Sequence, residues 1–149
     1  MSWRSFVRFF GGRFGASRAP SSEPEHLRRG RLGEEAARHH LENLGFQFLA
    51  ANHRWRRGEL DLVFEFCGLL VFVEVKTREV GGLLRPAAAV NRRKRLRLTR
   101  AALDYLRVIG RPRVPFRFDI VEVLIKSDQV WEVRHLPDAF RMSKPYRYG

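Results

Sequence analysis

The stretch GELDLVFEFCGLLVFVEVKTR, residues 58–78, decides the fold. Its two halves, Glu59–Phe66 and Leu69–Lys76, are rich in β-branched and aromatic residues, and Cys67-Gly68 separates them. This pattern predicts two antiparallel strands joined by a two-residue loop. Alternation of side chains along the first strand should place four apolar residues together on one face: Leu60, Leu62, Phe64 and Phe66.

The same hairpin also brings charged residues from its two strands together. Phe66 would face Leu69, and counting back along both strands then puts Asp61 directly opposite Glu74. Like charges at opposite positions repel, so two carboxylates beside apolar runs need a cation between them. Lys76, two residues beyond Glu74, shares its face. We expect either a shared site or an ordinary ion pair with Lys76 or a nearby arginine.

A third acid lies on the helix predicted from Gly33 to Asn43, before the hairpin. Glu34 heads a stripe with helical spacing that should dock on the sheet, and the stripe continues through Ala37, Leu41 and Leu44. A carboxylate on a buried stripe needs a metal ion or a basic group. The alternative is a first-turn acid that the helix dipole favours and that points to water.

The rest of the chain completes one α/β domain. Asn91 is a good N-cap for a long helix that should run to about Ile109. A helix between strands normally returns the chain parallel to an earlier strand, so we expect a mixed β-sheet flanked by helices, in the order α-β-β-β-α-β-β. The remaining predicted strands are Phe46–Ala51, Phe116–Ile125 and Val130–Leu136.

The composition of the chain indicates the class of its binding partner. The 149 residues suffice for one domain, and 44% of them are hydrophobic. A net charge of +13, carried mostly by arginine, favours a polyanionic partner, with nucleic acid first and an anionic membrane second. The alternative is a charge that serves solubility alone.

The single cysteine and the short apolar runs limit the class of protein. Cys67 is alone, which excludes an intramolecular disulfide and a multi-cysteine zinc site and fits a reducing, cytoplasmic location. The longest apolar run, Phe66–Val73, is far shorter than the ~20 residues of a membrane-spanning helix. We therefore expect no membrane span.

The first residues differ from the rest of the chain. No acid precedes Glu23, and arginines recur among aromatic residues and glycines. We expect a flexible basic arm over residues 1–29 and a folded domain over residues 30–149. We expect no secretory signal, because these residues contain no continuous apolar region. An organellar transit peptide and an arm that recruits the protein to a membrane or a DNA-processing complex are alternatives.

Three acids and a lysine directed at one spot suit metal-assisted hydrolysis of phosphodiesters. Hard carboxylate oxygens hold Mg²⁺, or Mn²⁺ in its place, and the ion keeps several waters and binds substrate phosphate. A nearby ammonium such as Lys76 can orient the nucleophile or neutralise developing charge.

The residues that carry this chemistry also resemble a known family. The stretches Gly58-Glu59-Leu60-Asp61 and Phe72–Arg78 resemble the motif of the PD-(D/E)XK nuclease superfamily, with Leu60 at the position of its proline. More closely, the chain resembles the YraN-type family of uncharacterised bacterial predicted endonucleases over roughly Arg31 to Phe140. Supporting matches are Gly33-Glu34, Ala37, Leu44-Gly45-Phe46, Lys94, Ala101 or Ala102, Tyr105-Leu106, Arg117-Phe118-Asp119 and Ala139-Phe140.

The resemblance implies a restriction-endonuclease-like fold and a set of roles. Asp61 and Glu74 would ligate the metal together with the carbonyl of Val75. Lys76 would be catalytic, and Glu34 would complete the acidic cluster.

A basic helix accompanies this site. Arg93, Arg97 and Arg100 gather on one side of the helix after Asn91, together with Arg107 and Asp104, and we expect them to contact nucleic-acid phosphates. The alternative is a solvated helix face. Lys94 lies on the buried side, where it would meet a phosphate or form a salt bridge with a core acid.

We therefore expect a magnesium-dependent endonuclease acting on DNA. The alternative is a nucleic-acid-binding module of the same fold without hydrolytic activity. The sequence leaves a homodimer open.

Overall fold

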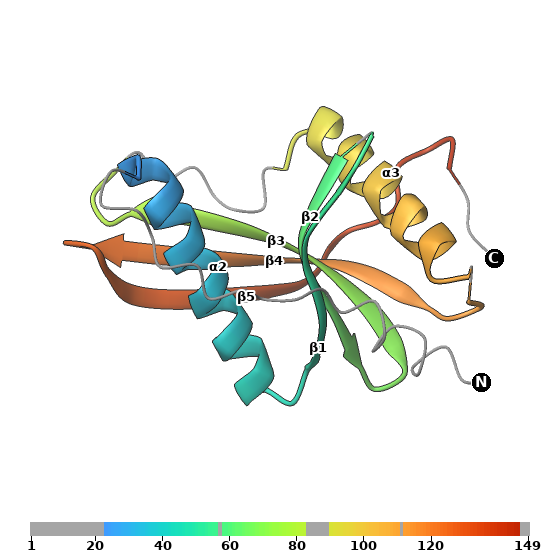
Figure 1. Ribbon diagram of the computed structural model, residues 1–149, viewed down its shortest axis with the longest axis horizontal. Coiled ribbons are helices and arrows are strands. Elements are labelled where there is room, and N and C mark those ends of the chain that lie inside the picture. The colour runs from blue at the N-terminus through green and yellow to red at the C-terminus, as the bar shows by residue number, and fades with distance from the viewer. Residues whose placement is uncertain (1–22, 57, 83–89, 111, 147–149) are drawn as a thin grey trace.

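The computed structural model describes residues 23–56, 58–82, 90–110 and 112–146. Over these residues the chain forms two helices and one five-stranded mixed sheet, so the predicted fold class and element order are confirmed (Figure 1). None of the helices in these ranges is long and apolar enough to cross a membrane. The elements are α2 (Glu25–Asn43), β1 (Gln47–Trp55), β2 (Gly58–Phe66), β3 (Leu69–Glu79), α3 (Arg92–Val108), β4 (Phe116–Lys126) and β5 (Gln129–Phe140).

The first described helix, α2, starts earlier than predicted. It begins at Glu25, directly after Pro24, whose carbonyl accepts hydrogen bonds from the backbone N–H groups of Leu27 and Arg28. Pro24 is a helix-start signal, but Gly30 and Gly33 made the first turns look non-helical from the sequence. The expected boundary between residues 29 and 30 therefore falls inside α2, and residues 1–22 of the expected arm lie outside the described residues.

The hairpin of β2 and β3 forms in the predicted register. Phe66 faces Leu69, and the pairing continues antiparallel to Leu62 and Val73. Cys67 and Gly68 both have positive φ angles, 50° and 85°, as a two-residue loop of the I′ type requires. Asp61 and Glu74 are the next residues along this register.

The sheet joins this hairpin to the C-terminal half of the chain. Its strand order is β1-β2-β3-β4-β5, with β3 and β4 parallel and the other pairs antiparallel. The parallel pairing runs from Leu70 opposite Phe116 to Glu79 opposite Ile125, and α3 makes the crossover between the two strands. β1 and β5 are longer than predicted and reach Trp55 and Phe140.

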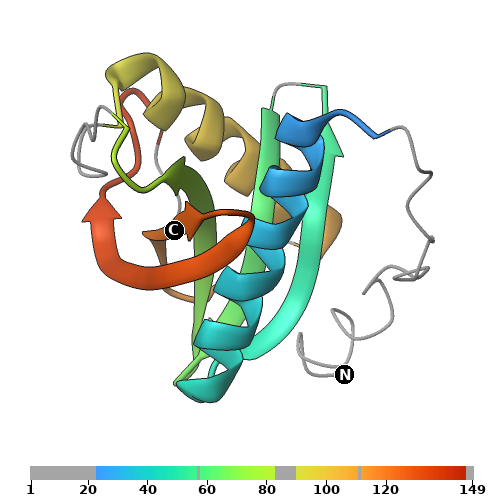
Figure 2. The ribbon, with the colours of Figure 1, turned by 90° about the vertical axis from the view of Figure 1, so that its left-hand side faces the viewer.

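Two hydrophobic cores lie on opposite faces of the sheet. Leu70 and Phe72 pack with the apolar side of α3, whereas Val71 and Val73 pack with Ala37 and Leu41 of α2. Because neighbouring residues on β3 point to opposite faces, the two helices cover the two sides of the sheet (Figure 2). Leu44, expected on the buried stripe of α2, is 51% exposed because it lies beyond the last helical turn.

The face of β2 that was predicted for Leu60 is wrong. Leu62 and Phe64 pack on the α2 side, but Leu60 is buried in the core on the α3 side. β2 turns toward α3 beyond the end of its pairing with β3 (Figure 1). Leu60 and Leu62 would share a face on a regular strand, but this turn places them on opposite faces of the sheet. A bulge in the partner strand β1, between Phe48 and Ala50, accompanies this bend, as bulges increase local twist.

The buried side of α3 is also wider than predicted. Leu98, Ala102, Tyr105 and Ile109 are buried as expected. Asp104, expected among the exposed arginines, is buried as well, because α3 packs on β1 in addition to β2.

Candidate functional site

Two glycines bring both helices close to the acidic residues. A Cβ atom on Gly33 would lie 1.8 Å from the Thr77 side-chain oxygen, so α2 lies tightly against β3 at this point. A Cβ atom on Gly58 would lie 2.8 Å from the carbonyl oxygen of Arg97, so α3 lies close to the start of β2. Glu34 directly follows the first glycine, which explains why a helix residue reaches the strands.

The three predicted acids line one cavity of about 390 Å³, here called the acidic cavity. Asp61 from β2, Glu74 from β3 and Glu34 from α2 all contribute to its wall. The backbone N–H of Val75 donates a hydrogen bond of 2.8 Å to Asp61 Oδ2, which fixes this carboxylate against β3. The half-buried Glu34 accepts a hydrogen bond of 3.1 Å from Asn52 Nδ2.

The electrostatics of the acidic cavity disfavour so many negative charges. Burial, with a smaller contribution from the nearby Glu74 carboxylate, raises the pKa of Asp61 to about 7 against the opposing hydrogen bond from Val75. Burial also raises the pKa of Glu34, while its hydrogen bond with Asn52 opposes this. The cavity therefore gains from any cation that enters it.

Glu74 is the most constrained of the three acids. Its side chain is 9% exposed, and Oε1 lies 2.9 Å from the ammonium nitrogen of Lys94. For Lys94, the structure thus shows the salt bridge to a core acid. The other oxygen, Glu74 Oε2, is buried and accepts no hydrogen bond from the described residues. A buried acceptor without a donor costs free energy, so a cation or a donor beside this oxygen would be stabilising.

Lys76 is not among the described residues that line the acidic cavity. It lines a second cavity of about 270 Å³, here called the lysine cavity, which it shares with Lys94, Arg93 and Arg97. Glu74 lines both cavities. The structure thus brings the three acids together and sets Lys76 beside Glu74 among the basic residues.

Of the four basic residues predicted to contact nucleic acid, three line the lysine cavity and one does not. Arg93 and Arg97 are exposed and, with Lys94, border the lysine cavity. Arg100 lies elsewhere, and its Nε donates a hydrogen bond of 2.9 Å to the hydroxyl of Tyr146.

Several residues of the acidic cavity were missed from the sequence. His26, Arg29, Thr77 and Arg78 line it together with the acids. Arg78 closes the stretch that decides the fold, and it forms an ion pair of 3.2 Å with the buried Glu122. Arg29 could have been found by starting the helix after Pro24.

The acidic cavity offers carboxylate oxygens, the donor type that hydrated Mg²⁺ uses. Among the residues described, no three or more His, Cys, Asp or Glu side chains are grouped to hold a metal ion, so they form no protein cage. Mg²⁺ commonly binds through one or two carboxylates and keeps several waters. Asp61, placed by the Val75 N–H, and Glu74, whose Oε2 has no hydrogen-bond donor among the described residues, are carboxylates of the type that such an ion uses.

Comparison with known proteins agrees with the resemblance seen in the sequence. A sequence model of the uncharacterised protein family UPF0102 matches residues 33–123, which include the three acids and both lysines. A UPF0102 protein of Koribacter versatilis is 42% identical over 123 residues, which cover 81% of this chain and 85% of that protein. A UPF0102 protein of Alkaliphilus oremlandii is 37% identical over 113 residues, covering 74% of this chain and 96% of that protein.

Proposed function

The chain belongs to the uncharacterised protein family UPF0102, and we propose that it is a metal-dependent nuclease that hydrolyses phosphodiester bonds in DNA. One observation carries the proposal. Asp61 and Glu74 are neighbouring, largely buried carboxylates, and Glu74 Oε2 has no donor among the described residues. A buried acidic pair of this kind, directly beside a strongly basic helix, suits a site for a cation and a phosphate.

The acidic residues would hold the cofactor. Asp61 and Glu74 would ligate Mg²⁺ or Mn²⁺ through Asp61 Oδ1 and Glu74 Oε2, the oxygens that accept no hydrogen bond from Val75 and form no bond to Lys94. The predicted contribution of the Val75 carbonyl remains part of this proposal. The bound ion would activate the attacking water and stabilise charge on the phosphate. Glu34 would face the ion's waters from the third wall of the cavity.

Lys76 supplies the ammonium of the proposed reaction. No ion pair with Lys76 is found in the described part of the chain, and the residue borders the lysine cavity beside Glu74. Its charge is therefore available to a phosphate oxygen that reaches Glu74. In this position it would neutralise negative charge that develops during hydrolysis.

The basic residues of α3 would hold the DNA backbone. Arg93 and Arg97 are exposed at the mouth of the lysine cavity, so a phosphate bound there lies beside Lys76. Guanidinium groups bind phosphate oxygens with two donors, but they do not read sequence in this way. The single cysteine, Cys67, agrees with activity in the reducing cytoplasm.

A second candidate function is a DNA-binding module that does not hydrolyse its ligand. The ion pair between Lys94 and Glu74 favours it, because the ammonium already neutralises part of the charge that a metal ion would neutralise. The two candidates differ in whether divalent ions bind and in whether Lys76 affects anything other than binding.

Single-turnover cleavage separates the two candidates. Supercoiled, linear and branched DNA are incubated with Mg²⁺ or Mn²⁺ and excess protein, using wild type and Lys76→Ala. The variant keeps both carboxylates and the arginines of α3, so DNA affinity should change little. Cleavage should fall by roughly 10²–10³-fold, as when one transition-state donor is lost.

Lys126→Ala is the matched control, because it removes a lysine from the end of β4, outside both cavities. Wild-type protein that binds these DNAs without cutting any of them would favour the binding module. Equal cleavage rates for wild type and Lys76→Ala would remove Lys76 from the reaction.

A further inference from the structure

A buried acid lies directly beside Lys76 in the sheet, but the two side chains form no ion pair. In the parallel pairing of β3 with β4, Lys76 is opposite Glu122. Side chains at opposite positions point to the same face, and neighbouring strands are about 5 Å apart, so the ammonium could reach this carboxylate. Among the described residues, however, Glu122 forms its ion pairs with Arg78 and Arg134. Two arginines therefore occupy the acid that lies within reach of Lys76.

Arg78 is the closer of the two cations to Glu122. Its Nε lies 3.2 Å from Glu122 Oε1, and the two side chains are only 25% and 9% exposed. Arg134 Nη1 lies 3.8 Å from the other oxygen, while Nε and Nη2 of Arg134 donate hydrogen bonds of 2.7 and 2.8 Å to Glu132. A carboxylate that is withdrawn from water needs a cation. Arg78 therefore supplies most of the charge that Glu122 requires.

The surroundings of Lys76 would drive its ammonium toward a vacant carboxylate. Three other cations line the lysine cavity and repel this ammonium: Arg93, Lys94 and Arg97. If Arg78 did not hold Glu122, Lys76 would gain an ion pair and lose this repulsion by turning from the cavity toward β4. The position of the ammonium thus depends on which cation holds Glu122.

We propose that Arg78 is a positioning residue, which holds the Glu122 carboxylate and thereby keeps the Lys76 ammonium free for a phosphate oxygen. This inference rests on the proposed function, in which Lys76 meets the phosphate beside Glu74. Arginine suits the task better than lysine, because its guanidinium is more weakly hydrated, so burial costs it less, and its charge is permanent. Arg78 acts through Lys76 and does not touch the reacting atoms.

Direct contact with a phosphate is the competing role of Arg78, since this residue also lines the acidic cavity. The two roles differ in their dependence on Glu122. A residue that only keeps Glu122 from Lys76 becomes dispensable once Glu122 has lost its charge. A residue that binds phosphate stays necessary.

The first measurement follows the ion pair itself, by urea unfolding of the full-length protein in EDTA at neutral pH. In the wild type, Lys76→Met removes an ammonium without an acid partner among the described residues, so the urea midpoint should change little. In Arg78→Gln the ammonium takes over Glu122, so adding Lys76→Met should lower the midpoint by roughly 0.5–1 M. When Glu122→Gln is also present, this loss should vanish.

The second measurement is single-turnover cleavage of DNA with Mg²⁺ or Mn²⁺. Arg78→Gln should cut roughly 10²-fold more slowly than wild type, close to Lys76→Ala, because the ammonium has left the phosphate. Arg78→Gln combined with Glu122→Gln leaves no charge of this pair buried and unpaired, so this variant should fold. It should cut nearly as fast as wild type, although Arg78 is absent.

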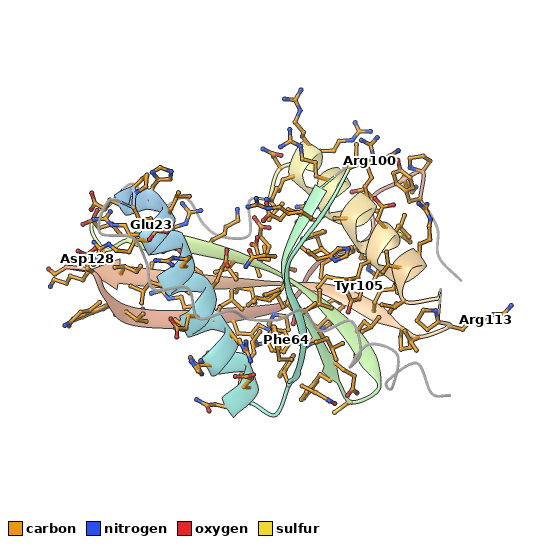
Figure 3. All side chains as sticks on the ribbon, viewed as in Figure 1. Glu23, Phe64, Arg100, Tyr105, Arg113 and Asp128 are labelled. Carbon is orange, nitrogen blue, oxygen red and sulfur yellow. The ribbon has the colours of Figure 1, made fainter. Side chains whose placement is uncertain are left out.

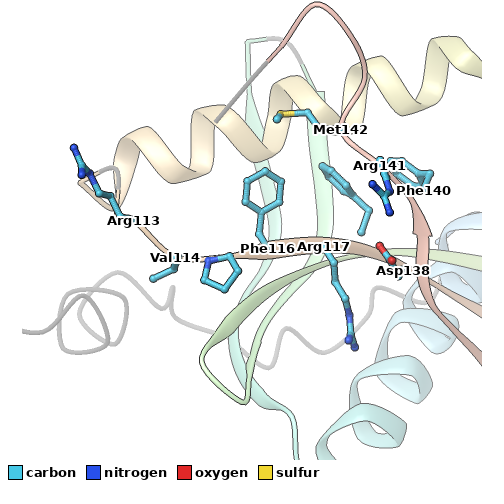
Figure 4. Close-up of a pocket in the computed structure, with 10 residues that line it drawn as sticks. Arg113, Val114, Phe116, Arg117, Asp138, Phe140, Arg141 and Met142 are labelled. Atoms are coloured by element: carbon cyan, nitrogen blue, oxygen red, sulfur yellow. The ribbon is translucent and has the colours of Figure 1, made fainter. Parts of the chain in front are cut away.

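Two other arginines serve as controls. Arg134→Gln removes the more distant cation at Glu122. Figure 3 shows Arg113, an exposed residue, at the end of the molecule opposite Asp128, which lies in the turn after β4. There Arg113 lines a cavity of about 560 Å³ between the start of β4 and the end of β5 (Figure 4). Neither Arg134→Gln nor Arg113→Gln removes Arg78, so adding Lys76→Met should leave the midpoint unchanged in both backgrounds.

Three results would overturn the proposal. The first is a loss of midpoint on Lys76→Met that is no larger in Arg78→Gln than in wild type, and the second is an equal loss in the Arg134→Gln background. The third is slow cleavage by the variant with both Arg78→Gln and Glu122→Gln, which would assign Arg78 a direct contact with phosphate. A wild-type protein that cuts no DNA would remove the proposed nuclease activity, whereas the unfolding comparison would still decide whether Arg78 keeps Lys76 from Glu122.

Discussion

Asp61 illustrates how much of the site depends on single side chains. Its carboxylate lies one residue beyond the last paired position of the hairpin and is held there by the Val75 N–H. The position could be predicted by counting along two strands. The ion pair between Glu74 and Lys94 was one of two alternatives in the sequence, because pattern alone does not show whether a buried lysine meets an acid or a ligand.

The charge of Asp61 should cost stability in the metal-free protein. Its folded-state pKa of about 7 lies above the ordinary 3.8, so the folded state binds a proton more tightly than the unfolded state does. Stability from this group is present below about pH 4 and is lost as the pH rises through about 7. Asp61→Asn keeps an acceptor for Val75 without the charge, so the free energy of unfolding above about pH 7 should rise by roughly 2–4 kcal/mol.

Urea unfolding in EDTA at several pH values measures this difference. The difference in the free energy of unfolding between Asp61→Asn and wild type should shrink toward zero as the pH falls to about 4. Glu132→Gln, an exposed change on β5, is the control. A gain that does not vary with pH would show that the Asp61 charge is not the cause.

Asp119 is a residue whose structural role the sequence did not reveal. It is fully buried and accepts hydrogen bonds from Arg117 and from the backbone N–H of Asp138, and it lies 2.7 Å from His135 Nε2. These contacts connect β4 to β5. The sequence showed Asp119 only as a family match, because most of its partners come from another strand.

At the scale of the elements, the docking of α2 depends on Gly33. Gly33→Ala should lower the free energy of unfolding by about 1–3 kcal/mol, because the added methyl group would overlap the Thr77 side chain. Gly30→Ala is the matched control on the same helix. Nothing lies within 4 Å of its Cβ position, so helix propensity alone should stabilise the protein by up to about 1 kcal/mol.

Thermal or urea unfolding of the two variants gives the comparison. Thr77→Ala removes the clashing oxygen and should recover part of the loss in the Gly33→Ala background. Equal stabilisation by both glycine substitutions would mean that α2 does not lie against β3 at this point.

The elements also show which predictions a local pattern supports. The β2–β3 hairpin was predicted in its register because strand alternation and a two-residue loop determine it locally. The face of the sheet on which Leu60 lies was not predicted correctly, because the bend of β2 toward α3 arises from packing between distant segments. The early start of α2 was missed since its first turns contain a glycine and are stabilised by pairs such as Arg29 with Glu25.

At the scale of the whole molecule, the net charge of +13 should appear in the salt dependence of binding. Replacing Arg93, Arg97 and Arg100 with glutamine should weaken binding to all duplex sequences about equally. The slope of log affinity against log salt should flatten by roughly 0.9 for each phosphate that the variant no longer neutralises.

Titrations of a labelled duplex at several salt concentrations give this slope. The triple change of Arg28, Lys126 and Arg134 to glutamine removes the same charge from residues that line neither the acidic cavity nor the lysine cavity. If both triple variants flatten the slope equally, the arginines of α3 do not bind the backbone specifically.

The site as a whole was predicted only in part. Glu34, Asp61 and Glu74 meet in one cavity as the combined strand and helix patterns indicated. Lys76, expected at the same spot, lines the lysine cavity, which shares Glu74 with the acidic cavity, and its place in a common site stays a prediction.

Calorimetric titration of Mn²⁺ and Mg²⁺ into wild type and Asp61→Asn tests most directly whether this is a metal site. Wild type should give a clear binding isotherm, and Asp61→Asn should bind the ion at least about tenfold more weakly, because a charged ligand is lost while the Val75 hydrogen bond can persist. Glu132→Gln should bind like wild type. Equal affinities of wild type and Asp61→Asn, or no binding by wild type, would contradict a metal ion held by Asp61 and Glu74.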